Sequence, residues 1–271
     1  MVQYEHKRAK TRKNPTKNLQ IGGKKALMAL TERQNEILKR LKENKSASVT
    51  VLAKELFVSE ATIRRDLAEM KSMGLIERSH GGALLPENAE EISIFFRMEK
   101  NASEKERAAT KAIMHIPPFK SVFVDSSSTA LALAERIDLS FKTVVTNNLQ
   151  TAIQLSKKPN INLILLGGNV AYNTISATGS WTTRQLSDFS FDLMLSSCAS
   201  VQDGGAYERS LDQKELKRMA FKRSKVRVLV IDHTKFGAHG TYRLADLAEY
   251  DFVLTDAIPD GVEGLENVKF L

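Results

Sequence analysis

Polar residues suited to holding an anionic, hydroxylated ligand follow four apolar stretches in the second half of the chain. These segments are Asp125-Ser126-Ser127-Ser128-Thr129, Thr146-Asn147, Gly167-Gly168-Asn169 and Asp232-His233-Thr234-Lys235. Backbone N–H groups, hydroxyls and lysine bind phosphate, whereas carboxylates and amides bind sugar hydroxyls. If the four segments converge, their chemistry favours a phosphorylated polyol.

The apolar stretches themselves predict the strands that would position these residues. Strands are expected over 121–125, 143–146, 161–166, 192–196, 226–232 and 251–254, with helices starting near Ser103, Thr129, Asn148, Ser180 and Asp212. This alternation predicts an α/β domain with a mainly parallel sheet. Because ligands of such sheets bind beyond the carboxyl ends of the strands, the four polar segments are expected to share one rim.

Each of the four motifs also has an ordinary structural explanation. A serine-rich turn between a strand and a helix often only caps the helix, and Gly-Gly after a strand is often a plain turn. No single motif therefore decides whether the chain has a ligand site.

Three short helices are predicted nearer the amino terminus. Thr31 and Gln34 have the spacing of a capping box, and a second helix is expected from about Thr50. Ser59 is expected to cap a third helix that runs to about Met73. The inward apolar positions are Ile37, Leu38 and Leu41 in the first helix, Leu52, Ala53 and Leu56 in the second, and Ile63, Leu67 and Met70 in the third.

The third of these helices has the arrangement of a DNA recognition helix. Ala61, Thr62, Arg64 and Arg65 lie opposite or beside Ile63 in its first turn and a half, the end that enters the major groove. Small Ala61 permits close approach, while the arginines can bind guanine or phosphate oxygens in a forked geometry. These residues predict contacts with duplex DNA.

A short hairpin with a glycine-containing tip follows the third helix. Its strands are expected over 75–78 and 83–85, around Ser79-His80-Gly81-Gly82. Glycine lets such a wing lie close to a DNA backbone. The candidate DNA contacts are thus Ser59, Ala61, Thr62, Arg64, Arg65, Arg78, His80 and Gly81. Taken singly, an exposed arginine pair or a lone histidine is usually only solvated surface.

The combined pattern resembles the DNA-binding signature of the DeoR family of bacterial transcriptional regulators. The similarity is carried by Val58 to Leu67, VSEATIRRDL, and by Gly74 to Ala83, GLIERSHGGA. That family has a sensor domain resembling ribose-5-phosphate isomerase, whose motifs Asp-x-Gly-Thr-Thr, Thr-Asn, Gly-Gly and Asp-x-x-Lys-Phe are similar to the four polar segments. Arg97 and Lys105 also stand where the family has basic residues.

The resemblance covers about Leu30 to Asp256 and implies a function. It implies a repressor of a carbohydrate-utilisation operon that binds operator DNA and is controlled by a phosphorylated sugar. Since symmetric oligomers match repeated half-sites, a homo-oligomer, dimer or tetramer, is expected. The departures from the family pattern are Ser127-Ser128 in place of Gly-Thr, the glycine-free stretch Ser196 to Ser200, and Gln213 where an acidic residue is common.

Two other classes of function remain open at this point. A sugar-phosphate isomerase needs a carboxylate base and an electrophilic partner, for which Asp125, Glu208, Glu215 and Lys235 are the raw material. Gln213 and the serine-substituted loop argue against that chemistry, so the chain is not expected to be an enzyme. The remaining alternative is a DNA-binding protein whose second domain is a non-sensing oligomerisation scaffold.

Composition excludes several classes of protein. The chain has 271 residues, of which 42% are hydrophobic, and a single cysteine, Cys198, so no disulfide can form within it. No Cys and His spacing suits zinc, and no apolar run approaches the roughly 18 residues that span a membrane. A cytoplasmic protein without a metal or cofactor is expected.

The net charge of +8 is concentrated in one segment. Residues 1–27 carry +7, which leaves +1 for the other 244 residues, so the total charge says nothing about the folded part. Residues 1–27 are predicted to be disordered, either as a basic arm that contacts phosphates or as sequence upstream of a true start at Met28. Beyond them we expect a winged helix-turn-helix over 28–85, a linker over 86–98 and an α/β sensor domain over 99–271.

Overall fold

The computed structural model describes residues 31–72, 75–79, 81–84, 93–171 and 173–259. The predicted basic arm or late start at 1–27, the predicted helix end at Met73, and the wing residues His80 and Leu85 lie outside these ranges. Within them, no helix is long and apolar enough to cross a membrane.

The amino-terminal part is a winged helix. Its elements are α1 (Glu32–Asn44), β1 (Ser46–Ser48), α2 (Val49–Glu55), α3 (Glu60–Ser72), β2 (Glu77–Ser79) and β3 (Gly82–Leu84), and its antiparallel strands are ordered β1-β3-β2. The predicted capping box at Thr31 is present, and the Ser59 hydroxyl accepts a 3.2 Å hydrogen bond from the Thr62 amide. Strand β1 was not predicted, because Ser-Ala-Ser is too short for a recognisable pattern and has no β-branched or aromatic residue.

The core of the winged helix consists of the apolar positions that the sequence predicts. Ile63, Leu67 and Met70 of α3 are fully buried against Ile37 and Leu52 of the first two helices. The wing packs equally closely on β1, since a Cβ added to Gly82 would lie 2.3 Å from the Ala47 carbonyl oxygen. This position therefore needs glycine for packing.

The larger part of the chain is built on a parallel sheet of six strands. They are β4 (Ser121–Val124), β5 (Thr143–Thr146), β6 (Asn162–Leu165), β9 (Phe191–Ser196), β12 (Ser224–Ile231) and β14 (Phe252–Thr255), in the order β14-β12-β9-β4-β5-β6. All six predicted strands are confirmed within a residue or two. The chain builds the sheet outward in both directions from β4 and β9, so the topological switch point lies between these two strands.

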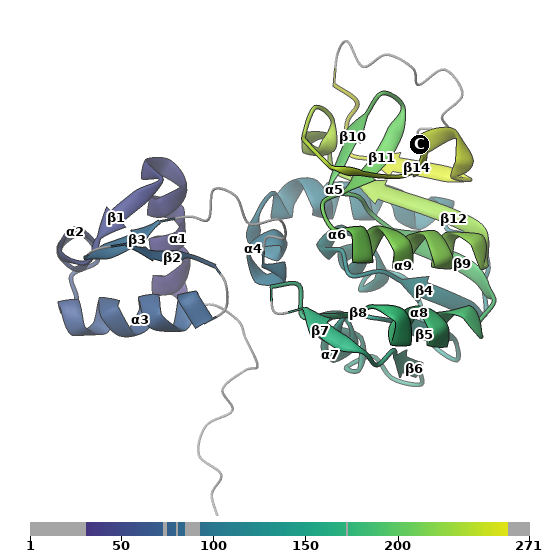
Figure 1. The fold of residues 1–271 in the computed structure, drawn as a ribbon, viewed down its shortest axis with the longest axis horizontal. Coiled ribbons are helices and arrows are strands. Elements are labelled where there is room, and N and C mark those ends of the chain that lie inside the picture. Colours follow the sequence, from purple (N-terminus) through teal and green to yellow (C-terminus); the bar gives the residue numbers. More distant parts are fainter. Residues whose placement is uncertain (1–30, 73–74, 80, 85–92, 172, 260–271) are drawn as a thin grey trace, which may run out of the picture.

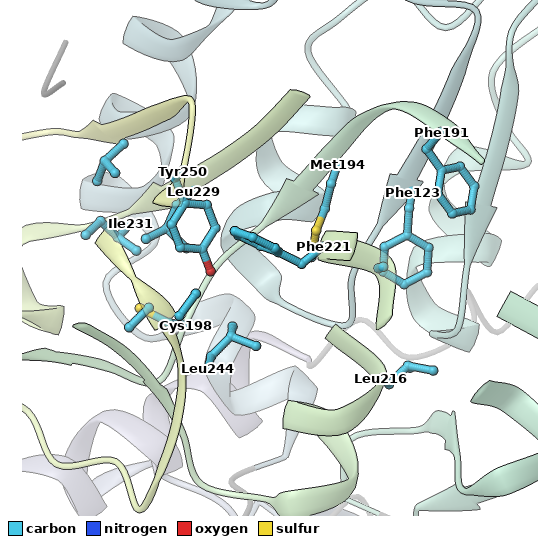
Figure 2. Close-up of a cluster of buried hydrophobic side chains, with 14 of the residues drawn as sticks. Phe123, Phe191, Met194, Cys198, Leu216, Phe221, Leu229, Ile231, Leu244 and Tyr250 are labelled. Atoms are coloured by element: carbon cyan, nitrogen blue, oxygen red, sulfur yellow. The ribbon is translucent and has the colours of Figure 1, made fainter. Parts of the chain in front are cut away.

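Helices cover both faces of this sheet (Figure 1). Those on one face are α5 (Ala102–Ala112), α6 (Ser128–Ala134) and α7 (Leu149–Leu155), and those on the other are α8 (Ser180–Ser187) and α9 (Leu211–Lys222). Each strand alternates between two apolar cores, as in β4, where Val122 and Val124 face α5 and α6 while Phe123 faces the other core. Figure 2 shows this second core, in which the Phe221 and Tyr250 rings meet edge to face at 5.0 Å.

Several shorter elements were not predicted. They are α4 (Ile94–Glu99), β7 (Asn169–Ala171), β8 (Ser176–Thr178), β10 (Ser200–Gln202), β11 (Gly205–Glu208) and β13 (Tyr242–Asp246), together with 3-10 turns at Ile113–His115, His233–Lys235 and Leu247–Glu249. Strands β7 and β8 form an antiparallel hairpin, and β10, β11 and β13 form a small antiparallel sheet. Helix α4 begins inside the segment expected to be a linker.

Candidate functional site

The recognition-helix residues predicted from sequence lie on the outer side of α3. Ala61, Arg64 and Arg65 are exposed and Thr62 is half-buried, while Ile63 between them is fully buried. Ser59, at the amino-terminal end, is exposed as well. The geometry leaves the first turns of α3 available to a major groove.

Two ion pairs hold this surface in place. Asp66, buried on α3, accepts hydrogen bonds from Arg33 Nε and Nη2 at 2.5 and 3.1 Å, which ties α3 to α1. Arg64 Nη2 lies 2.7 Å from the Glu60 carboxylate, and the other oxygen of Glu60 accepts from the Thr50 hydroxyl. Glu60 therefore orients Arg64 along the helix surface before any nucleic acid is bound.

The wing presents one of its predicted residues as an exposed side chain. Arg78 is exposed on β2, opposite buried Ala83 of β3. Gly81, at the tip, has φ +81°, a conformation that glycine adopts without strain. The predicted contact His80 lies outside the described residues.

A cavity of about 120 Å³ opens at the switch point of the larger sheet. It lies beyond the carboxyl ends of β4, β9 and β12, the place where ligands bind in open α/β sheets. Its lining residues are Arg97, Lys100, Asn101, Lys105, Ser126, Ser127, Ser128, Thr129, Thr174, Ser197, Cys198, Ala199, Glu208, Arg209, Gln213, Lys217, Asp232, Thr234, Lys235 and Ala238.

The structure brings eight of the predicted ligand residues together in this lining and leaves five outside it. Those in the lining are Arg97, Lys105, Ser126, Ser127, Ser128, Thr129, Asp232 and Lys235. Those outside are Asp125, Thr146, Asn147, Gly167 and Gly168. All four segments follow parallel strands at the same edge of the sheet, but Thr146-Asn147 and Gly167-Gly168 do not line this cavity.

The five outside residues make contacts within the protein, although the buried Oδ1 of Asn147 has no hydrogen-bond partner among the described residues. The β8 segment covers the end of β5, where Asn147 Nδ2 donates to the Ala177 carbonyl at 2.9 Å and buried Thr146 accepts from the Asn148 amide. Strand β6 is the outer strand of the sheet, and its Gly167-Gly168 turn packs on α8. A Cβ at Gly168 would lie 2.0 Å from Thr182 Oγ1, which explains the glycine without a ligand.

Asp125 lies beneath the cavity in a buried charged cluster. Lys217 Nζ, on α9, lies 2.8 Å from Asp125 and 2.6 Å from Glu208. Asp125 also accepts hydrogen bonds from Ser196 Oγ and from the amides of Ser127 and Ser197. Burial disfavours the charged forms of Asp125 and Lys217. Their mutual attraction outweighs it, so the pKa of Asp125 lies below its ordinary value and that of Lys217 lies above its own.

This cluster engages two of the carboxylates on which the isomerase alternative depends. Asp125 and Glu208 share the single positive charge of Lys217, so both are held in ion pairs. Glu215 is exposed on the surface of α9, where it pairs with Lys214. Sequence reasoning missed Lys217, although Gln213 and Lys217 are polar members of the otherwise apolar stripe Leu216, Ala220 and Phe221, which is the signal that could have found it.

The cavity is strongly cationic once this cluster is set aside. Outside the cluster, five basic residues and one carboxylate, Asp232, line the cavity. The cluster itself carries one net negative charge, because Lys217 faces both Asp125 and Glu208. Burial, together with the charge of Lys235, lowers the pKa of Lys105 to about 7, and burial also lowers the pKa of Lys235. Two amines whose pKa values are lowered in this way favour a nearby anion, which stabilises their charged forms.

Two buried polar atoms in the lining have no hydrogen-bond partner within the described part of the chain. They are one carboxylate oxygen of Asp232 and the hydroxyl of Ser197, and both residues are at most 1% exposed. A buried acceptor without a donor is costly, typically by about 1–3 kcal/mol. A ligand hydroxyl would satisfy each of them.

The departures from the family pattern fit this geometry. Ser127 has φ −89° and caps α6 by accepting from the Ala130 amide, so its Cβ introduces no strain. Gln213 bridges two parts of the wall, accepting from the Ser126 hydroxyl at 2.9 Å and donating to the Ser176 hydroxyl at 2.7 Å. An amide makes both bonds because it accepts and donates, whereas an ionised carboxylate only accepts.

Family comparison identifies the class of protein to which these two parts belong. Residues 33–89 match the DeoR-like helix-turn-helix domain, and residues 100–257 match the DeoR C terminal sensor domain. The chain belongs to the DeoR family of DNA-binding transcriptional regulators.

The similarity to several transcriptional regulators extends over nearly their whole length. The HTH-type transcriptional regulator GolR of Listeria innocua is 36% identical over 83% of this chain and 90% of its own. The glycerol-3-phosphate regulon repressor of Escherichia coli is 33% identical, over 86% and 93%, and the lactose phosphotransferase system repressor of Staphylococcus epidermidis is 31% identical, over 83% and 91%. These relatives agree with the expectation that the chain is not an enzyme.

Solved structures of ribose-5-phosphate isomerase show a remote likeness. The enzyme from Methanocaldococcus jannaschii aligns with 51% of this chain and 55% of its own, at 10% identity and a TM-score of 0.36. A likeness at that level carries no information about activity.

Proposed function

We propose that the protein represses an operon for the use of a carbohydrate or polyol, and that a phosphorylated polyol in the cavity controls its affinity for operator DNA. The observation that carries this proposal is the cavity at the switch point, which is lined by Lys105, Lys235 and Arg97 and by Asp232, one of whose carboxylate oxygens has no hydrogen-bond partner in the described part of the chain. The cations suit a phosphate, and the carboxylate suits a neighbouring hydroxyl. A ligand that carries both a phosphate and a hydroxyl engages the cations and Asp232 together.

The names of the relatives support the same class of ligand. One is a repressor of a glycerol-3-phosphate regulon and another of a lactose phosphotransferase system. Both names refer to small polyhydroxy compounds or their phosphates. A cavity of about 120 Å³ matches ligands of this size better than a nucleotide.

On the DNA side, we propose that α3 enters the major groove and the wing follows the backbone. Arg64 and Arg65 supply the base or phosphate contacts, and Arg78 and Gly81 of the wing lie over a phosphate. Two or more copies of the chain bind repeated half-sites, since a symmetric oligomer presents its winged helices at a fixed spacing.

Binding of a ligand is tested by thermal unfolding with inorganic phosphate, glycerol 3-phosphate and hexose 6-phosphates. At a concentration 100 times the dissociation constant, stabilisation of about 2.7 kcal/mol is expected from the phosphate esters. Inorganic phosphate should stabilise less, because it lacks the hydroxyl that Asp232 requires. Lys235→Met should abolish the effect. Equal stabilisation of native protein and variant would contradict a site in this cavity.

The recognition helix is tested by alanine variants of the two arginines. Arg64→Ala and Arg65→Ala are each expected to weaken binding to a selected DNA duplex by about 1–3 kcal/mol, measured by electrophoretic mobility shift. Arg184→Ala, on the surface of α8, is the matched control and should bind DNA normally. Because these side chains are exposed, thermal unfolding should be unchanged. Native affinity in both α3 variants would refute the assignment.

A further inference from the structure

Helix α4 contacts the ligand cavity and the winged helix at the same time. Ile94 and Phe95 are 1% and 5% exposed and belong to the same buried cluster as the cores of α1, α2 and α3. Met98, one turn later, packs against both that cluster and the core on the α5 face of the sheet. Figure 1 shows α4 on the side of the larger part that faces the winged helix.

The carboxyl end of α4 is fastened to the wall of the cavity. Lys105, a cavity residue, donates hydrogen bonds to the carbonyls of Arg97 and of Lys100, the latter at 2.5 Å. Ser128 Oγ donates to the Arg97 carbonyl, and Arg97 Nη2 donates to the Ser126 carbonyl at 3.3 Å. Every one of these side chains lines the cavity, so an anion bound there acts directly on the end of α4.

A second connection runs through the segment 173–176. Thr174 lines the cavity, and its hydroxyl lies 2.7 Å from that of Ser176, which accepts from Gln213 in the cavity wall. Ile175, between them, packs its side chain against the buried cluster that α4 shares with the winged helix. The same segment reaches α4, because the Asn173 carbonyl accepts a 3.0 Å hydrogen bond from the Ile94 amide.

Ile175 adopts a conformation that its side chain disfavours. Its φ is +43°, and β-branched residues rarely occupy this region. Two consecutive residues at the start of α7 hold the main chain there. Asn148 Nδ2 donates to the Thr174 carbonyl, and the Leu149 amide donates to the Ile175 carbonyl. A strained residue that joins two parts of a molecule is suited to an element with two arrangements.

We propose that α4 and the segment 173–176 form the connection through which the cavity controls the orientation of the winged helix. Helix α4 spans about 9 Å at 1.5 Å per residue, so Arg97 and Phe95 move as one body. The inference rests on the proposed function for its ligand. The mechanical connection itself exists whether or not that ligand is a phosphorylated polyol.

The test without ligand is a double-mutant cycle on DNA affinity. The probe is a duplex selected by the native protein from a random library. Lys105→Met releases the cavity end of α4, and Phe95→Ala removes its winged-helix end. Lys105→Met is expected to change DNA affinity by about fivefold or more in the native background and by less than about twofold with Phe95→Ala. Phe141→Ala, the same substitution at an exposed site, is the control background and should leave the Lys105 effect intact.

Ile175→Gly provides an independent variant should Phe95→Ala unfold the winged helix. Glycine removes the side chain and also the backbone strain, so folding should be preserved. Ile258→Gly, at an exposed loop position, is its control. The Lys105→Met effect is expected to disappear with Ile175→Gly and to persist with Ile258→Gly.

A test with ligand separates this inference from the proposed function. Glycerol 3-phosphate is titrated into native protein, Phe95→Ala and Ile175→Gly, and both its binding and its effect on DNA affinity are measured. Native binding combined with a reduced DNA response in the variants supports the connection. An additive double-mutant cycle and an undiminished response in the variants would overturn it. Failure of every phosphate ester to bind refutes the proposed function alone, because the ligand-free cycle still decides the connection.

Discussion

The two functional regions of this chain differ in how their residues are assembled. The candidate DNA-contacting residues of α3 come from one local stretch, point outward, and depend on a core of simple apolar positions such as Ile63 and Leu67. The cavity is assembled from the ends of β4, β9 and β12 together with α4, α5 and α9. Four of its charged residues are buried, namely Lys105, Glu208, Lys217 and Asp232. Single substitutions of outward-facing residues are expected to leave the stability of the fold unchanged, whereas substitutions of buried charged residues are expected to lower it.

The largest expected difference between the regions concerns Lys217. Lys217→Met leaves Asp125 and Glu208 buried without their counter-charge, and breaking a buried ion pair in this way costs about 3–5 kcal/mol. Chemical denaturation followed by circular dichroism measures the loss. Lys214→Met on the same helix is the control, because its pair with Glu215 is near the surface and should contribute at most about 1 kcal/mol. A loss from Lys217→Met no larger than that of the control would contradict the buried cluster.

A change of pH is expected to have an intermediate effect, on the binding of an anion in the cavity. Burial holds the pKa of Lys105 at about 7, so the free protein loses this charge as pH rises through neutrality. An anion favours the charged amine, which makes binding strongest below pH 7 and weaker above it. The advantage of native protein over Lys105→Met in binding a phosphate ester should shrink by about tenfold between pH 6 and 8.5, measured by calorimetry.

Comparison with Lys105→Met at each pH removes the titration of the ester itself from this measurement. The phosphate monoester gains charge with rising pH, since its second pKa is about 6. That gain in charge affects native protein and Lys105→Met equally, so it cancels in the ratio of their affinities for the ester. A constant ratio across the range would show that Lys105 does not titrate with ligand binding.

The smallest expected effect is a change in the free energy of unfolding, and it should be similar in both regions. Phe57, before α3, and Phe141, before β5, have φ +53° and +60° and are 93% and 85% exposed. Asparagine tolerates this conformation better than phenylalanine, and neither ring has packing to lose. Phe57→Asn and Phe141→Asn should each raise the free energy of unfolding by about 0.5–1 kcal/mol. Destabilisation by either substitution would reveal a contact that the ring makes elsewhere.

The same contrast explains how much the sequence could predict. The six parallel strands were predictable because runs such as 226–231 are continuously apolar, and α3 was predictable from the spacing of Ile63, Leu67 and Met70. Strands β7 and β8 were missed because Asn-Val-Ala and Ser-Ala-Thr are too short and too polar to show a period. Because β8 covers the end of β5, Thr146 and Asn147 do not line the cavity, and nothing in the sequence indicated that cover.

The pairing within the charged cluster was beyond sequence reasoning for a different reason. Asp125 is far in sequence from Glu208 and Lys217, and only the tertiary fold brings it within hydrogen-bond distance of Lys217. Asp125 alone looks like a ligand residue at the end of a strand. Its partner on α9 makes it part of the foundation of the cavity. Helix α4 was missed because Ile94 and Phe95 follow a proline-containing acidic stretch, and their apolar partners lie in the winged helix.

The central claim is that the cavity and the winged helix act on one another, and it is tested by one binding measurement. The affinity of native protein for a selected DNA duplex is determined by fluorescence anisotropy with and without a saturating phosphate ester that the protein binds. The account predicts a change of about 5- to 150-fold, which corresponds to coupling of about 1–3 kcal/mol. An ester that binds in the cavity and leaves the DNA affinity unchanged would contradict the account and identify the larger part as a scaffold.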